Sequence, residues 1–377
     1  MAEVATSPEI RFTFDLFHRL ARQQPSTNIF FSPCSVMLCL AMLYDGARGE
    51  TRTGMAKALE FAGLDSAGVE NAVAQLTSVL QAHDSGVQLR IANSLWCNRS
   101  VQVDPAYTAR ANKIYGAEVR EIDFAAADAA ASINAWVSEK TASMIPRMVD
   151  RLDAATLMVA LNAIYFKGLW KRPFLRRVTS DEPFTTGSGE TKTLPRMRQG
   201  GKFQYLERQE FQAVILPYEG SRIAMYVFLP GRKSSLDQLH DSLSAGQWEA
   251  WTNQFAEVQG SVQLPRFKMS FLAELGPALV NLGMGLAFDR ERADFGGIRS
   301  GPPPVWIGEV LHRAVAEVNE EGTEAAAATV GVMGAALRPQ RPEPYFEMIV
   351  DRPFLFLIRD ETTGNILFLG SVVDPSA

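Results

Sequence analysis

A run of small residues followed by closely spaced prolines interrupts the C-terminal part of this 377-residue sequence. The stretch Gly322–Pro344 holds few large apolar side chains, and the three prolines in its last third block regular structure. A segment this long without secondary structure is uncommon inside a compact protein, and such loops usually carry function. We therefore expect an exposed functional loop over about residues 320–344; a plain exposed linker is the alternative.

Outside this stretch the chain predicts helices first and strands later. Apolar residues of Ile10–Arg22 recur at helical spacing, and Ser32 followed by Pro33 is typical of the start of a helix, here to about Tyr44. Ala155–Phe166 is too apolar to be half exposed, which indicates a central strand. Further helices are expected at 50–61, 66–83, 105–115, 125–143, 236–253 and 275–282, and further strands at 87–96, 118–124, 203–205, 213–217, 223–229, 261–271 and from 305 onward. This order, with little βαβ alternation, indicates an α+β fold.

Composition and charge exclude several classes of protein. The chain is 47% hydrophobic and 21% charged, which rules out a disordered tail, a collagen-like fibre and a coiled coil. Its net charge of −5 gives no reason to expect a nucleic acid or an anionic membrane as a partner. Because Met1–Phe12 lacks the apolar core of a signal peptide, we expect a cytoplasmic protein, or a secreted one if a leader has been removed.

Familiar catalytic and ligand-binding motifs are missing from the sequence. None of the four histidines lies in an HExxH motif, and the G-x-S-x-G, GxxxxGK and GxGxxG patterns are absent. Cys34, Cys39 and Cys97 cannot form a disulfide framework and lack the spacing of a zinc or redox site; the first two lie in an apolar run and are expected as buried thiols. His312 is flanked by apolar residues, which favours a hydrogen-bonded core histidine over a general base. We therefore expect no enzyme, no cofactor and no metal site.

Four stretches of the sequence resemble one protein family, in the family's order and at its spacing. They are Asn28–Ser35, Asn162–Trp170, Glu320–Thr329, and Asp351–Phe356 with Leu367–Gly370. From about residue 10 to residue 375 the chain resembles a serpin, a member of the serine protease inhibitor family. In that family these stretches open the central helix, form the third strand of the main sheet, form the proximal hinge of the reactive-centre loop, and form the C-terminal strands.

The resemblance implies both a fold and a mechanism. The fold is a single domain over residues 1–377, with about nine helices, three β-sheets and an exposed reactive-centre loop at about 320–344. A target serine protease attacks the scissile bond of this loop and forms an acyl-enzyme, and the cleaved loop inserts into the main sheet and traps the covalent complex. The expected partner of the monomer is thus a serine protease; a non-inhibitory serpin acting as a carrier or chaperone is the alternative.

Small residues dominate the hinge that the resemblance assigns. The hinge comprises Glu320, Gly322, Thr323, Glu324, Ala325, Ala326, Ala327, Ala328 and Thr329. Side chains alternate between the faces of an inserting strand, so Thr323, Ala325, Ala327 and Thr329 share one face, and Glu324 lies on the other. Small side chains can enter a slot between two strands without clashes, whereas a charged or bulky residue at Thr323 would block it. The hinge therefore favours an inhibitor over a carrier.

The resemblance also assigns two regions of the main sheet. The shutter is a polar cluster beneath the strands that open, and it corresponds to Ser32, Ser35, Asn162 and His312. These hydroxyl, amide and imidazole groups can satisfy one another when buried. Trp170 matches the breach, where the loop first enters the sheet, and Glu320 is expected to hold the hinge through a nearby charge. Ordinary buried polar structure is the alternative for each residue.

Family spacing places the scissile bond between Ala336 and Leu337. The preceding residues Met333, Gly334 and Ala335 suit the small, shallow specificity pocket of an elastase-like or subtilisin-like serine protease. We therefore expect a target of that kind.

Other partners fit the sequence less well. A chymotrypsin-like protease would cleave after Leu337 or Met333, and this is the second choice. Trypsin-like cleavage is disfavoured because Arg338 and Arg341 both precede proline, which lacks an N–H. A heparin-like cofactor is not expected, because the helix predicted at 66–83 contains no Lys or Arg, whereas heparin-binding serpins carry a basic face there.

Overall fold

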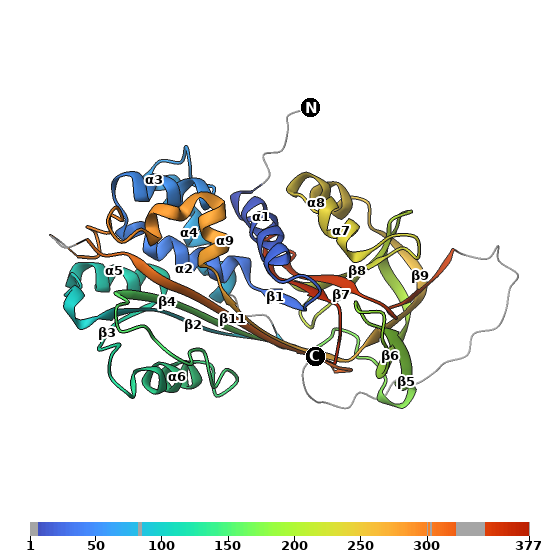
Figure 1. Ribbon diagram of the computed structural model, residues 1–377. Helices are drawn as coiled ribbons and strands as arrows, with labels where there is room; N and C mark the ends of the chain where they lie inside the picture. The colour runs from blue at the N-terminus through green and yellow to red at the C-terminus, as the bar shows by residue number, and fades with distance from the viewer. Residues whose placement is uncertain (1–6, 82–84, 300, 302–303, 322–343, 377) are drawn as a thin grey trace, which may run out of the picture.

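The computed structural model describes residues 7–81, 85–299, 301, 304–321 and 344–376. These residues form nine α-helices and two hydrogen-bonded sheets, which lie beside one another (Figure 1). The helices are α1 (Pro8–Gln23), α2 (Pro33–Gly46), α3 (Gly49–Ala58), α4 (Ser66–Gln81), α5 (Pro105–Tyr115), α6 (Ala129–Lys140), α7 (Leu236–Ser242), α8 (Ala245–Thr252) and α9 (Gly276–Leu279). The expected α+β class and the expected number of helices are confirmed.

Helix α2 is the most buried helix, and it begins where the sequence predicts. Ser32 is its N-cap: the Ser32 Oγ accepts a hydrogen bond from the Ser35 N–H at 3.3 Å, and Pro33 occupies the first helical position. Almost every residue of α2 is buried, including Cys34 and Cys39. The helix therefore presents its N-terminal hydroxyls to the protein interior and not to solvent.

The five-stranded sheet carries most of the residues assigned to function. Its order is β10 (Phe267–Glu274), β11 (Ile307–Val318), β4 (Met158–Gly168), β2 (Val87–Asn98) and β3 (Glu118–Ile122). Helix α6 covers one face, and α2 lies against the other (Figure 1). Both faces of β4 are buried, which confirms the predicted central strand: Ala160 and Ile164 pack on the α2 side, and Val159 and Leu161 on the α6 side. Since Asn162 has the parity of Ala160, it faces α2.

The second sheet has nine strands and is organised around one long strand. Its strands are β1 (Ile29–Phe31), β14 (Ile366–Val372), β13 (Phe354–Asp360), β8 (Ile223–Pro230), β7 (Phe211–Pro217), β6 (Thr191–Glu207), β9 (Ala256–Pro265) and β12 (Tyr345–Ile349), with β5 (Ser180–Thr185) paired to β6. Strand β6 pairs with β5 near its start, with β9 along its middle and with β7 at its end. Two of the three expected sheets are thus joined through β6.

Two strand predictions need correction. The single strand predicted at 261–271 is two strands, β9 and β10, which belong to different sheets. The chain changes sheets at Pro265 and Arg266, because Pro265 has no N–H for a continuing ladder. The short strand predicted at 203–205 is only the end of β6; the rest of β6 and its partner β5 are rich in exposed polar residues, so the alternation that marks a half-buried strand is weak there.

Three further features of the described residues concern their thiols, their helices and their acidic and imidazole side chains. Cys34, Cys39 and Cys97 are all buried free thiols. Within the described ranges no helix is long and apolar enough to cross a membrane. The same residues contain no group of three or more His, Cys, Asp or Glu side chains arranged to hold a metal ion.

Candidate functional site

The register of the five-stranded sheet aligns three polar side chains in one row. His312 on β11 lies opposite Asn162 on β4, and Asn162 lies opposite Asn93 on β2. Ser32 and Ser35 at the start of α2 lie against this row. The four shutter residues, far apart in the sequence, are therefore brought together by strand register and by one helix N-terminus.

Hydrogen bonds connect all the shutter residues through Asn162. The Asn162 Nδ2 donates to the Ser35 Oγ at 2.6 Å and also to the Asn93 Oδ1. The Asn162 Oδ1 lies 2.5 Å from the His312 Nδ1, and the Ser32 N–H donates to the His312 Nε2 at 3.2 Å. Since Nε2 accepts a hydrogen bond, the proton of a neutral imidazole is on Nδ1 and is donated to Asn162.

The shutter is uncharged and almost fully excluded from water. Its residues are at most 1% exposed, and Asn93 is 4% exposed. Burial lowers the pKa of His312 from its ordinary 6.5 to about 3, so the imidazole is neutral at physiological pH. Asn93 was not predicted from the sequence. The only signal in the sequence was one amide side chain within a predicted strand. Its partner, Asn162, could be identified only from the register of β2 and β4.

At the end of β4, a short segment binds the last described residues before the loop. The Trp170 Nε1 donates to the Asn319 carbonyl oxygen at 2.9 Å, and the Trp170 N–H donates to the Glu321 carbonyl oxygen at 3.0 Å. The Phe174 N–H donates to the Glu320 carbonyl oxygen at 2.7 Å. We call residues 170–174 the clamp. It holds the backbone at positions 319–321 in the region that the sequence analysis assigned to the breach.

The Trp170 indole is itself fixed by a neighbour. It stacks on the Tyr218 ring with centroids 4.5 Å apart and planes 9° from parallel. Both rings are buried. The indole N–H is therefore aimed at Asn319 by packing, and not only by its own hydrogen bond.

Glu320 is a buried carboxylate held by a charged partner. The Arg266 Nε donates to one carboxylate oxygen at 2.7 Å, and the Arg266 Nη2 donates to the other. The Thr179 Oγ1 adds a third hydrogen bond at 2.6 Å. Burial alone would favour the neutral acid, but the hydrogen bonds from Arg266 and Thr179 outweigh it and lower the pKa of Glu320. The side chain is thus ionised although it is only 2% exposed.

The gap into which a loop could insert is closed. Strands β11 and β4 are hydrogen-bonded directly to each other as a parallel pair, from Ile307 opposite Met158 to Ala316 opposite Phe166. The structure is therefore that of the five-stranded, uninserted sheet.

Most of the predicted loop residues lie outside the described residues. They are Gly322, Thr323, Glu324, Ala325, Ala326, Ala327, Ala328 and Thr329 of the hinge, Met333, Gly334 and Ala335 of the specificity segment, and the bond Ala336–Leu337. Of the hinge, the described residues include only Glu320.

Comparison with known proteins identifies the family. A family model described as Serpin (serine protease inhibitor) matches residues 8–375. The chain is a serpin. The family is described as one of serine protease inhibitors and not of enzymes, so the expectation that the chain is no enzyme is confirmed.

Relatives and solved structures cover this serpin over nearly its whole length. It is 36% identical over 387 residues to a bovine protein named leukocyte elastase inhibitor, covering 99% of this chain and 100% of the relative. The thermophilic serpin tengpin in its native state has a TM-score of 0.89 at 26% identity, covering 99% of this chain and 95% of tengpin. Human thyroxine-binding globulin also has a TM-score of 0.89, at 27% identity, covering 99% and 98% of the two chains.

Proposed function

We propose that this serpin inhibits a serine protease by presenting residues 322–344 as bait and inserting the cleaved segment between β4 and β11. The observation that carries the proposal is the direct parallel pairing of these two strands at the centre of the sheet. A segment that turns back at the end of β11 runs antiparallel to both of them. Insertion therefore replaces one parallel ladder with two antiparallel ladders, which are more stable per residue.

The energetic gain of insertion favours an irreversible trap. Each added ladder hydrogen bond contributes about 0.5–1.5 kcal/mol net. Two new ladders, less the parallel ladder that is lost, can together match an ordinary folding free energy of about 5–15 kcal/mol. The small side chains at Thr323, Ala325 and Ala327 support the proposal, because they can pass between two strands that are already buried on both faces.

The shutter and the breach take different parts in this cycle. We infer that Asn162 and His312 hold β4 and β11 together until the cleaved loop arrives, since their hydrogen bond crosses the gap that must open. We infer that Glu320, Arg266 and the clamp hold the hinge until cleavage releases it. The first inference rests on the hydrogen bond between Asn162 and His312, and the second on the bonds of Glu320 to Arg266 and to the clamp. Each joins two parts of the protein that have to separate.

The proposed target is an elastase-like or subtilisin-like serine protease cleaving at Ala336–Leu337. The small residues before the bond support this choice, and so does the name of the bovine relative, leukocyte elastase inhibitor. Cleavage by a chymotrypsin-like protease after Leu337 or Met333 is the second candidate.

A mixing experiment tests both the mechanism and the bond. The serpin is incubated with pancreatic elastase or with a subtilisin, and the products are separated on a denaturing gel. We expect a band at the summed mass that survives detergent, and a released C-terminal fragment whose mass begins at Leu337. The matched variant Thr323→Arg should be cleaved at the same bond without forming the band. Cleavage after Arg338 would overturn the target class.

The carrier alternative has one observation in its favour, the close structural match to thyroxine-binding globulin. A heat test separates the two functions. An inhibitory serpin gains heat stability after its loop is cleaved, because insertion adds a strand to the sheet. A cleaved product that melts at the same temperature as the intact protein, and that forms no covalent band, supports the carrier.

A further inference from the structure

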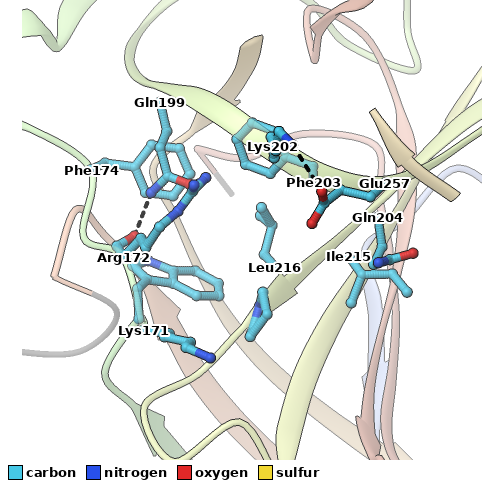
Figure 2. Close-up of a pocket in the computed structure, with 12 residues that line it drawn as sticks. Lys171, Arg172, Phe174, Gln199, Lys202, Phe203, Gln204, Ile215, Leu216 and Glu257 are labelled. Carbon is cyan, nitrogen blue, oxygen red and sulfur yellow. Dashed lines mark hydrogen bonds and ion pairs between the residues drawn. The ribbon is translucent and has the colours of Figure 1, made fainter. Parts of the chain in front are cut away.

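A cavity of about 330 Å³ lies against the side chains of the clamp. Its floor is made of four buried apolar side chains from the clamp, β6 and β7: Trp170, Phe174, Phe203 and Leu216. Figure 2 shows Arg172 with Gln199 on one side of the cavity and Lys202 with Glu257 near its other side. The cavity is therefore apolar at its base and cationic at its rim.

Three cations line the cavity, Lys171, Arg172 and Lys202, and Arg172 is the one that lies over an aromatic ring of the floor. Lys202 is paired with Glu257 at 3.2 Å. Among the described residues Arg172 has no carboxylate partner; its guanidinium donates to the Gln199 Oε1 at 3.1 Å and lies over the Phe203 ring, 4.7 Å from the centroid. Partial burial lowers the pKa of Arg172, which reflects a cation that has lost hydration without gaining an anion.

The backbone of β6 is shaped around this guanidinium. Gly201 has a φ of +148°, and a Cβ at this position would lie 2.6 Å from the Arg172 Nη1. Any side chain here would displace Arg172 from its place over Phe203. The absence of a side chain at Gly201 thus leaves room for the guanidinium over the Phe203 ring.

We propose that this cavity binds a small molecule with an apolar aromatic body and one carboxylate, and that the bound ligand slows release of the hinge. The aromatic body would lie on the floor, and the carboxylate would accept hydrogen bonds from Arg172. The volume is at the lower end of the range for small-molecule sites, which limits the ligand to one or two rings.

The link to the hinge is direct, because the same two clamp residues line the cavity and form hydrogen bonds with residues 320 and 321. Trp170 and Phe174 contribute their rings to the floor, and the same two residues donate their backbone N–H groups to Glu321 and Glu320. A ligand that packs on both rings stabilises the clamp in the arrangement that holds 319–321. It therefore favours the uninserted state, since a ligand shifts an equilibrium toward the state that it binds better. This second half of the proposal rests on the proposed function.

Binding is tested first, on the intact serpin and without protease. The probe is 2-naphthoate and the matched control is 2-naphthamide, which has the same rings without the charge; both are titrated by calorimetry. We expect naphthoate to bind at least tenfold more tightly than naphthamide, and Arg172→Gln to remove this difference. Arg198→Gln is the control variant, because Arg198 lies on β6, which also carries Gln199 and Phe203, but is paired with Glu182 at 2.6 Å and does not line the cavity.

Equal affinities of the two probes, no binding of either, or unchanged naphthoate binding by Arg172→Gln would each overturn the site.

The link to the hinge is tested by adding saturating naphthoate to the protease reaction. We expect at least a twofold rise in the ratio of cleaved serpin to covalent complex, absent in Arg172→Gln. An unchanged ratio overturns the link. Failure of the proposed function is distinct, because then no covalent complex forms even without naphthoate.

Discussion

The shutter and the breach both restrain β11, but with opposite chemistry. The shutter is neutral and buried, and each of its side chains is hydrogen-bonded to another polar group. The breach uses an ionised carboxylate, Glu320, whose partner Arg266 is 42% exposed along its side chain. One region excludes charge and water, and the other combines a buried charge with access to solvent.

In the proposed cycle, the difference follows from what each region has to do. At the shutter, a new strand must enter and every polar group must find a partner again, and a charge without its counterion would be costly there. At the breach, the hinge leaves, and Arg266 can be hydrated as soon as Glu320 departs. A neutral network is therefore suited to forming new hydrogen bonds around an inserted strand. A half-exposed ion pair is suited to releasing the hinge.

The largest expected effect comes from Asn162→Ala. This change leaves Ser35, Asn93 and His312 without their shared partner, and a buried polar group without a partner costs about 1–3 kcal/mol. We expect the first unfolding transition in urea to lose about 3–5 kcal/mol.

Asn93→Ala is the matched control for this prediction. Asn93 has one bond to the network, through its Oδ1, so its loss leaves Asn162 bound to Ser35 and His312. We expect a smaller loss, about 1–2 kcal/mol. Equal losses in the two variants would contradict a network centred on Asn162.

The second prediction separates the two regions by pH. The pKa of His312 is lowered to about 3, so between pH 6.5 and 3 the unfolded chain binds a proton that the folded chain does not. This contribution to stability is complete above pH 6.5 and falls as the pH drops. We expect the wild type to lose about 2 kcal/mol more than His312→Gln between pH 7 and pH 5.

The pH dependence of stability has to be compared between the wild type and the variants, because the buried Glu9 changes stability with pH in the opposite direction to His312. Burial raises the pKa of Glu9 to about 7, so its contribution to stability grows as the pH falls from 7 toward 4.5. Glu9→Gln should remove that trend, so that the contribution of His312 is visible in this variant. At the breach, the lowered pKa of Glu320 means that its contribution is lost only below pH 4.5. Parallel pH profiles for the wild type and His312→Gln would show that the shutter histidine is not neutral.

Glu320→Gln should have a smaller effect than either shutter change. The glutamine keeps an acceptor for Thr179 but removes the charge that faces Arg266, and the exposure of Arg266 reduces what that charge contributes. We expect a loss of about 1–2 kcal/mol in low salt and less in 1 M salt. The control is Glu182→Gln at the more exposed pair with Arg198, which should change stability by less than about 0.5 kcal/mol.

Local sequence patterns predicted where the helices and strands lie better than they predicted which strands pair with each other. The N-cap at Ser32 and the central position of β4 follow from residues adjacent in the sequence, and both are confirmed. The break between β9 and β10 at Pro265 was not predicted, although it has two local signals. One is the proline itself, and the other is that the apolar residues change from even positions in β9 to odd positions in β10.

The site residues depended on information that no local pattern holds. Ser32, Ser35, Asn162 and His312 were grouped by the family resemblance, and the structure shows that they touch. Arg266 as the partner of Glu320, and Asn93 as a partner of Asn162, were missed because each contact depends on strand register or on a change of sheet between distant segments. Such contacts are set by tertiary packing, which short-range spacing does not encode.

The smallest expected effect tests whether the breach acts apart from the shutter. Trp170→Phe keeps a ring on Tyr218 but removes the indole N–H that holds the Asn319 carbonyl, a loss of about 1 kcal/mol. We expect faster hydrogen exchange in peptides that contain the clamp and residues 319–321, and unchanged exchange in the centre of β4. Tyr218→Leu, which removes the stack and leaves the indole bond, should produce the same pattern more weakly. Faster exchange at the centre of β4 in either variant would show that the two regions open together. The neutral shutter and the charged breach would then be parts of one cooperative unit.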